Sequence, residues 1–382
     1  MHAQSEAARS EVVGPDVSLP GSELLAPRFF GLLTLVLAVL LVVTLLVLRH
    51  RRRRGAGDRP AMWASAVLGV LMVASIVMTA VTWPPPFSTP EFPPLGRLFP
   101  EEAFFYRTAD DLAVSPDSDR FIAAMGDHSL SAGFGGEPRQ GVVFGIPFNL
   151  VDADSPTEEV RFRNGGANAY RGPYPVTDPA YIESLPTYGF DNHYVALDRQ
   201  AGRMWELLGV NVWFGTWEAD AGALWDLDSL DYGRWKTTVS GLPLLPGVLS
   251  YDEVAAGRVE HVVWAAATTI SSTRTVWPAL DTDGLSDDPD APPMGSWLRL
   301  RADADLSGLG PQSRVIAEGL QRHGIVLSDT SGQRFALRGT ADGRWDTEDL
   351  RGMGRFTPAD FEVVEHESLM VAPDSMAARP EE

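Results

Sequence analysis

The chain has no cysteine and only one lysine, Lys236, and the absence of cysteine excludes several kinds of chemistry. Without cysteine there are no disulfides, no thiolate nucleophiles, no zinc–thiolate sites and no iron–sulfur clusters. Acidic residues outnumber basic ones by 51 to 31, which gives a formal net charge of −20. So acidic a chain disfavours nucleic acid and anionic lipid as partners, and is compatible with cationic partners, divalent cations or neutral sugars.

Several well-known catalytic motifs are also missing. The chain contains no G-x-S-x-G nucleophile elbow, no Walker loop, no dinucleotide-binding glycine fingerprint and no H-E-x-x-H motif. Because the most easily recognised reaction classes leave no signature here, the sequence alone does not decide whether the protein is an enzyme.

Two long uncharged runs stand near the start of the chain. The first spans residues 29–48 and the second residues 61–83, and neither contains Asp, Glu, Lys, Arg or His. Each is long enough to cross the roughly 30 Å hydrocarbon core of a membrane as a helix. Ionisable residues inside a membrane usually mark transport paths, so their absence predicts an integral anchor rather than a transporter.

The loop between the two runs, residues 49–60, decides the predicted orientation. It carries six arginines against the single acid Asp58, whereas residues 1–28 carry two arginines and four acids. Short arginine-rich loops stay in the cytoplasm, so we expect a helical hairpin in the plasma (inner) membrane with both termini extracytoplasmic. The length of the first run and the acidic tail before it argue against a cleaved signal peptide.

The rest of the chain predicts a linker, one folded domain and a tail. Residues 84–100 contain seven prolines and predict an extended, semi-rigid linker. Residues 101–371 consist mostly of short segments rich in Val, Phe, Trp and Tyr, separated by Gly, Pro, Asn and Asp. We therefore expect a β-dominated, sandwich or jelly-roll-like extracytoplasmic domain with a few peripheral helices, followed by a disordered tail at 372–382.

Some elements of this domain are predicted individually. Residues 193–198 and 203–210 should form a hairpin, because two strand-like segments flank a short glycine-containing turn. Residues 312–323 have apolar side chains at helical spacing, and residues 347–353 form a weaker helix candidate. Residues 356–364 predict a capped turn followed by a final strand.

Residues 144–364 contain long, specific motifs. They include GIPFNLV (145–151), DNHYVALD (191–198), GLPLLPGVLSYDEVAAGRVEH (241–261) and PPMGSWLRLRADADLSGLG (292–310). In their order these motifs resemble an uncharacterised bacterial family of secreted or membrane-anchored proteins. The resemblance implies a shared fold and no particular activity. The segments WKTTVS (235–240) and PALD (278–281) depart from the family pattern, which implies an altered polar, histidine-containing surface.

The block at 241–261 contains the first candidate site. A Pro–Gly turn precedes the adjacent carboxylates Asp252 and Glu253, and His261 lies eight residues after Glu253. Glycoside hydrolysis needs two carboxylates on opposite sides of a sugar bond. Three other acids could supply the second carboxylate: Asp198, Glu206 and Asp226. In the structural alternative, Asp252 caps the following turn and Glu253 pairs with an arginine.

A second candidate site combines Asp191, His193 and Asp198. Side chains alternate between the two faces of a strand, which predicts Asp191 and His193 on one face. There they could bind a metal or act as a base and its orienting carboxylate. The structural alternative is a half-buried histidine that is hydrogen-bonded to its neighbours.

An acidic loop at 281–290 supplies a weak metal candidate. Asp281, Asp283 and Asp287 could bind calcium, because hard cations favour oxygen ligands. The full EF-hand spacing is missing, so a solvated acidic loop is the alternative, and calcium is the only cofactor that the sequence suggests.

Tryptophan is frequent, with 11 in the chain. Trp213, Trp217 and Trp225 are candidate ligand-binding residues because exposed aromatic faces suit sugar rings, and the alternative is burial in a β core. Together the predicted topology, the carboxylates and the tryptophans favour a cell-envelope protein that interacts with polysaccharide. Three forms of this hypothesis stay open: a glycan hydrolase, a non-catalytic glycan-binding module, and an envelope-assembly module.

Overall fold

A computed structural model describes residues 90–136, 143–163, 166, 169–183, 191–213, 215–332 and 334–380, and before them the helical residues 42, 49, 67, 69–71, 73 and 74. The predicted membrane hairpin and its arginine-rich loop therefore lie almost entirely outside the described residues and stay a prediction. Within the described residues, no helix is both long and apolar enough to span a bilayer. The chain divides into two units, and residues 89–382 belong to the unit described below.

The largest sheet has six strands in the order β1-β14-β11-β13-β12-β15. Its strands are β1 (Leu130–Ser131), β11 (Val263–Ala267), β12 (Trp297–Leu300), β13 (Ile325–Thr330), β14 (Phe335–Leu337) and β15 (Phe361–Val363). The pairs β1–β14 and β11–β13 are parallel, and the other three pairs are antiparallel. All five residues of β11 are buried, as expected for a central strand that is covered on both faces.

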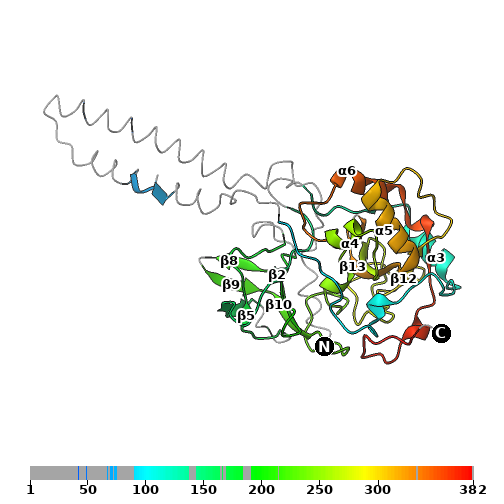
Figure 1. Cartoon of the computed structure of the whole chain (residues 1–382), viewed down its shortest axis with the longest axis horizontal. Coiled ribbons are helices and arrows are strands. Elements are labelled where there is room, and N and C mark those ends of the chain that lie inside the picture. Colours follow the sequence, from blue (N-terminus) through cyan, green and yellow to red (C-terminus); the bar gives the residue numbers. More distant parts are fainter. Residues whose placement is uncertain are drawn as a thin grey trace. The chain divides into compact units, whose positions relative to one another are not determined.

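Four α-helices accompany this sheet (Figure 1): α3 (Ser118–Met125), α4 (Tyr251–Ala255), α5 (Pro311–Arg322) and α6 (Thr347–Leu350). The longest, α5, confirms the helix predicted at 312–323. It begins with Pro311, whose missing N–H costs nothing in the first turn, and it buries Ile316 and Leu320. Gly324, with φ +74°, lets the chain reverse into β13, and a Cβ there would lie 2.3 Å from the Leu298 carbonyl oxygen.

The remaining strands form three smaller sheets. Four strands have the order β10-β7-β6-β2, namely β2 (Asn149–Leu150), β6 (Tyr194–Asp198), β7 (Arg203–Leu208) and β10 (Ala221–Asp226). β3 (Thr157–Glu158) pairs with β5 (Tyr174–Pro175), and β9 (Thr216–Ala219) lies between β4 (Val160–Phe162) and β8 (Asn211–Trp213). The antiparallel pair β6–β7 confirms the predicted hairpin.

Short 3-10 helices complete the described elements: Phe104–Tyr106, Leu245–Gly247, Arg351–Arg355, Pro358–Asp360 and Glu367–Leu369. The fourth of these carries a capping box between Thr357 and Asp360 and leads directly into β15. This arrangement confirms the capped turn and final strand predicted at 356–364. The β-dominated fold with few helices is likewise confirmed, and its parallel strand pairs are a feature that the sequence did not predict.

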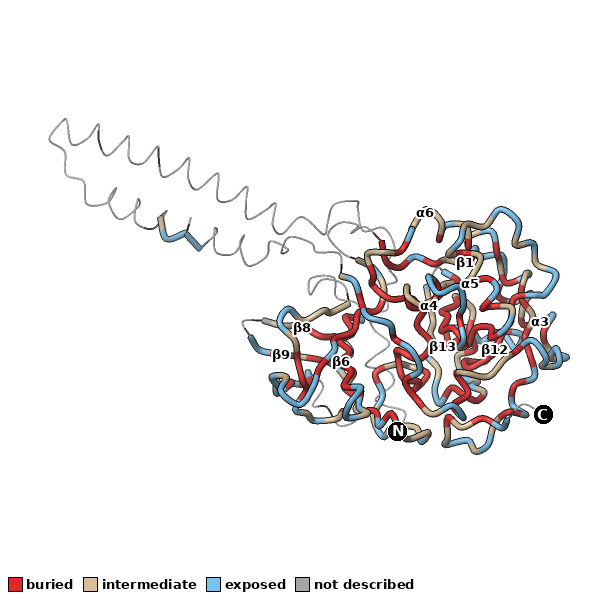
Figure 2. The backbone as a smooth tube through the Cα atoms, in the orientation of Figure 1, coloured by how far each residue is buried: buried red, intermediate tan, exposed pale blue. Residues whose placement is uncertain are grey.

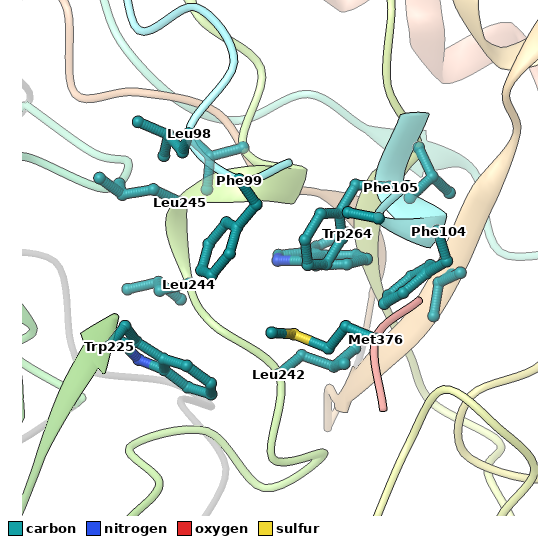
Figure 3. Close-up of a cluster of buried hydrophobic side chains, with 14 of the residues drawn as sticks. Leu98, Phe99, Phe104, Phe105, Trp225, Leu242, Leu244, Leu245, Trp264 and Met376 are labelled. Atoms are coloured by element: carbon teal, nitrogen blue, oxygen red, sulfur yellow. The ribbon is translucent and has the colours of Figure 1, made fainter. Parts of the chain in front are cut away.

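A hydrophobic cluster joins the four-stranded and six-stranded sheets. Val195, Leu197 and Met204 contribute from β6 and β7, whereas Trp264, Trp297 and Val326 contribute from β11, β12 and β13. Figure 3 shows the part of this cluster around Trp264, with Leu242, Leu244, Leu245 and Trp225 among its members. Buried residues follow the strands of both sheets in Figure 2. The described domain therefore packs around shared side chains, without any disulfide.

The domain is longer at both ends than the sequence predicts. Phe92 and Phe99, inside the predicted linker at 84–100, are each 5% exposed and belong to the central cluster. In the predicted disordered tail, Met376 is fully buried and its carbonyl accepts a hydrogen bond of 2.9 Å from the Phe104 N–H. The proline-rich composition predicted an extended linker and the polar composition a disordered tail, but buried apolar side chains fix parts of both segments in the fold.

Candidate functional site

A cavity of about 190 Å³ lies where the four-stranded and six-stranded sheets meet. One part of its lining is apolar and comes from Ile146, Leu208, Val239, Leu242, Leu244 and Trp264. The other part is polar and includes Asp191, His193, Ser240, Asp283, Asp329 and Arg338. Pockets for drug-sized ligands measure about 300–1,000 Å³, so this cavity suits a small molecule or one unit of a larger one.

The register of the β6–β7 hairpin explains which side chains face the cavity. Val195 and Glu206 are directly opposite each other, so they lie on the same face of the sheet. His193 precedes Val195 by two residues and Leu208 follows Glu206 by two, and both line the cavity. Pairing of the two strands therefore places one histidine and one leucine at the same opening.

His193 forms a buried pair with Glu183. Its Nδ1 lies 2.6 Å from Glu183 Oε2, and the two side chains are 10% and 19% exposed. Burial lowers the pKa of His193, but the Glu183 carboxylate outweighs burial and raises it. Burial likewise raises the pKa of Glu183, and His193 outweighs it so that the net pKa is lowered. The pair therefore favours an imidazolium held by a carboxylate.

The other ring nitrogen of His193, Nε2, makes no hydrogen bond to any described residue, and the side chain lines the cavity. A histidine whose one nitrogen is held by a carboxylate and whose other is free is the arrangement of an oriented acid or base. The sequence predicted Asp191 as the orienting carboxylate, and Glu183 holds this place instead. Asp191 reaches the cavity through Asn192, which has φ +35°, rather than by strand alternation.

The six-stranded sheet and the loop before it contribute two further carboxylates. Asp329, on β13, forms an ion pair with Arg338 directly after β14. Asp283 accepts a hydrogen bond of 2.5 Å from the Thr330 hydroxyl. Burial raises the pKa of Asp283, and the nearby Asp329 and Asp281 carboxylates raise it further. The cavity is thus acidic, and the guanidinium that lines it is already paired.

Ser240 has a buried hydroxyl without a partner. It is fully buried and lines the cavity, yet its Oγ makes no hydrogen bond within the described part of the chain. Leaving a buried polar group unsatisfied costs about 1–3 kcal/mol. Such a group deserves a functional explanation, because the fold gains nothing from it.

Glu206 lies beside the loop that carries Ser240, and the sequence predicted it as a possible second catalytic acid. Its side chain is fully buried on β7, where it accepts hydrogen bonds from the Thr237 hydroxyl and from the Leu244 N–H at 2.7 Å. Burial raises the pKa of Glu206, and these donors offset the increase only in part. Glu206 therefore anchors the loop that carries Ser240 rather than lining the cavity itself.

Asp252, Glu253 and His261 lie outside this cavity and make structural contacts. Glu253 closes a capping box at α4, accepting from the Ser250 N–H at 2.6 Å, and its other oxygen is 3.0 Å from His261 Nε2. His261 Nδ1 donates to the Val262 carbonyl at 2.8 Å, so neither ring nitrogen is free to accept a proton. Asp252 forms an ion pair with Arg344 at 2.9 Å.

The alternative weighed in the sequence analysis was that Asp252 caps a turn and Glu253 pairs with an arginine. The structure shows these two contacts with the residues exchanged: Glu253 caps the helix and Asp252 pairs with the arginine. Asp198 and Asp226, the other two predicted second carboxylates, bond backbone groups close to them in the sequence. Asp198 accepts hydrogen bonds from the Gln200 and Ala201 N–H groups at 3.0 and 2.8 Å, which shapes the hairpin turn. Asp226 accepts from the Asp228 N–H at 3.1 Å.

The predicted calcium ligands do not converge. Asp281 pairs with Lys236 at 2.7 Å, Asp287 accepts from the Ser272 hydroxyl at 2.6 Å, and Asp283 turns toward the cavity. Among the residues that the structure describes, no group of three or more acidic or histidine side chains could hold a metal ion. The alternating aspartates of this loop therefore each bond a different protein group, and they do not gather around one point.

The predicted aromatic ligand-binding residues are buried where their side chains are described. Trp217 is 6% exposed and packs edge-on against Tyr194 at 5.1 Å between ring centroids, and Trp225 is 2% exposed. The side chain of Trp213 lies outside the described residues. Burial in a β core, the alternative weighed for these tryptophans, is thus what the structure shows for two of them, while Trp264 lines the cavity instead.

Among the residues that build the site, Ser240, Asp329 and Arg338 of the lining and Glu183 behind His193 were not predicted from the sequence. One of them left a readable signal, because Asp329 ends the apolar strand segment IVLSD and a charge inside a central strand needs a partner. Ser240 lies in WKTTVS, which was noted only for its departure from the family pattern. Glu183 left no signal, since its role depends on a partner from another strand.

Comparisons with protein-family models, with curated proteins and with solved structures find no match to this chain. The function is therefore argued from the geometry and chemistry of the cavity.

Proposed function

We propose that this protein is anchored in the plasma membrane by its N-terminal hairpin and binds carbohydrate in the cavity of its extracytoplasmic, sandwich or jelly-roll-like domain. The two uncharged runs and the arginine-rich loop between them support the anchor and its orientation. The ligand would be one sugar unit of a cell-envelope polysaccharide, because the cavity measures only about 190 Å³. The motif resemblance to secreted or anchored bacterial proteins agrees with this location.

The observation that carries the proposal is the two-sided lining of the cavity. A sugar ring offers apolar C–H faces and a rim of hydroxyl groups that donate and accept hydrogen bonds. Leu242, Leu244 and Trp264 supply an apolar wall (Figure 3), and carboxylates together with the Ser240 hydroxyl supply polar partners. Binding sites of this kind combine mostly apolar walls with a few placed polar groups.

The charge of the lining argues against phosphate-bearing or strongly acidic ligands. Asp191, Asp283 and Asp329 line the cavity, whereas its two basic side chains, His193 and Arg338, are paired with Glu183 and Asp329. An incoming anion would have to displace one of these carboxylates. A neutral polyol can instead donate its hydroxyl hydrogens to them.

A second candidate function is glycan hydrolysis in the same cavity, and the Glu183–His193 pair favours it. The free Nε2 of His193 could exchange a proton with a bound hydroxyl or water, and the raised pKa of Asp283 suits a carboxyl group that gives up a proton. Hydrolysis also needs two carboxylates about 5–10 Å apart across the sugar bond. Release of reducing ends from envelope polysaccharide would distinguish this candidate from simple binding.

The binding proposal is tested by removing the Ser240 hydroxyl in the full chain, purified in detergent. Because that hydroxyl has no partner in the described structure, Ser240→Ala should keep the urea unfolding midpoint or raise it slightly. The same change should weaken the binding of neutral monosaccharides about fivefold to tenfold, the value of one hydrogen bond to a ligand. Isothermal titration calorimetry with a sugar panel measures the affinity.

Ser313→Ala is the matched control. Ser313 is also fully buried, but its hydroxyl donates to the Asp349 carbonyl at 2.6 Å and lies outside the cavity lining. We expect this variant to lose about 1 kcal/mol of stability and to keep full sugar affinity. If no sugar of the panel binds the wild type, or if Ser240→Ala leaves every affinity unchanged, the cavity is not the carbohydrate site.

A further inference from the structure

We propose that the cavity selects sugars that carry a primary ammonium group over neutral and anionic sugars. This inference rests on the proposed carbohydrate function and specifies its substrate class.

Negative charge exceeds positive charge around the cavity. Three carboxylates line it, and a fourth, Glu183, lies directly behind His193. The two cationic side chains are each committed to one carboxylate, His193 to Glu183 and Arg338 to Asp329. Asp191 and Asp283 form no ion pair with any described residue: Asp191 only adds to the raised pKa of His193 and of Arg338, and Asp283 accepts from the Thr330 hydroxyl.

Asp283 is the carboxylate that such a cation would stabilise most. Burial raises its pKa, and the neighbouring Asp329 and Asp281 carboxylates add repulsion that the single Thr330 hydroxyl does not cancel. Charge-assisted hydrogen bonds are roughly twice as strong as neutral ones. An ammonium group beside Asp283 would replace repulsion between carboxylates with attraction.

Ser240 provides the independent indication that the acidic lining is a binding site. Ser240 is fully buried and lines the cavity, and its Oγ has no hydrogen-bond partner in the described structure. An ammonium group carries three donors and no acceptor, so it needs several oxygen acceptors in one place. The Asp191 and Asp283 carboxylates and the Ser240 hydroxyl oxygen supply such acceptors. A hydroxyl group of a neutral sugar has a single hydrogen to donate and would use only one of these acceptors.

The test compares four ligands that share one ring: D-glucosamine, D-glucose, N-acetyl-D-glucosamine and D-glucose 6-phosphate. Each is titrated calorimetrically into the full chain in detergent at pH about 6.5, below the pKa of about 7.7 that is typical of an α-amino group. We expect glucosamine to bind at least about tenfold more tightly than glucose, and the phosphate to bind most weakly.

Asp283→Asn is the diagnostic variant, because the amide oxygen still accepts from Thr330 and the negative charge is lost. It should weaken the binding of glucosamine far more than the binding of glucose, and so remove most of the preference for glucosamine. Asp287→Asn is its matched control, since this aspartate lies four residues further along the same loop, bonds Ser272 and does not line the cavity. The control should keep the full preference.

The possible failures of the two proposals can be told apart. Equal affinity for glucosamine, glucose and N-acetylglucosamine would overturn the ammonium inference and leave the carbohydrate proposal standing. Tighter binding of the phosphate, or a glucosamine preference that survives in Asp283→Asn, would also overturn it. If none of the four ligands binds the wild type, the carbohydrate proposal fails and the inference fails with it.

Discussion

The ionisable residues of the predicted sites differ in whether they reach the cavity. Glu253, His261 and Asp252 bond partners inside the fold and do not line the cavity. His193 and Asp283 are held by one partner each and present their remaining capacity to the cavity. The difference depends on the partners and not on the residue types, so single residues in the sequence did not reveal it.

The Glu183–His193 pair predicts a pH-dependent contribution to stability. His193 has a raised pKa, so its contribution is fully present below its ordinary value of 6.5 and is lost as the pH rises through the raised one. Glu183 has a lowered pKa, so its contribution is present above 4.5 and is lost as the pH falls through the lowered one. The pair should therefore stabilise the domain most between these two ordinary values.

Glu183→Gln should accordingly lower the unfolding free energy by about 2 kcal/mol near pH 5.5, and by clearly less near pH 8.5. Urea unfolding followed by tryptophan fluorescence at both pH values measures the difference. Glu348→Gln, at an exposed pair with Arg351, is the control and should leave the midpoint unchanged at either pH. A loss of stability in Glu183→Gln that is the same at both pH values would contradict the charged pair.

At the scale of elements, local signals predicted some parts of the domain well. The turn between β6 and β7 needs only nearby residues, because Asp198 accepts from the two N–H groups that follow it. The helix α5 is likewise bounded by Pro311 and Gly324, whose effects are local. The parallel pair β11–β13 could not be predicted in this way, because about sixty residues separate the partners and a parallel pair needs a long crossover connection.

The C-terminal segment gives a testable consequence at this scale. Met376 is fully buried in the cluster of Figure 3, so Met376→Ala should lower the unfolding free energy by about 2–5 kcal/mol. Val371→Ala, at a side chain of the same segment that is 54% exposed, should change it by less than about 0.5 kcal/mol. Thermal unfolding of the two variants measures both effects. A disordered tail would instead give the same small change for both.

For the whole molecule, the absence of cysteine makes the predicted membrane topology easy to test. Ala56→Cys places a single thiol in the arginine-rich loop, and Val371→Cys places one on the exposed surface of the domain. With a membrane-impermeant maleimide on intact spheroplasts, we expect labelling at position 371 and none at position 56 until the membrane is permeabilised. Labelling at position 56 alone would show that the orientation is opposite to the predicted one. Labelling at both positions would argue against the hairpin.

The sequence by itself determined the β-dominated class, the β6–β7 hairpin, α5 and the capped turn before β15, because each depends on periodicity, turn residues or caps within a few positions. It also carries the acidic charge and the two uncharged runs from which the membrane anchor is predicted. Only the tertiary structure decided the cavity. His193, Ser240, Asp283 and Arg338 of the lining and Glu183 behind His193 are spread over more than 150 residues of chain. They come together because a common hydrophobic cluster packs the two sheets together.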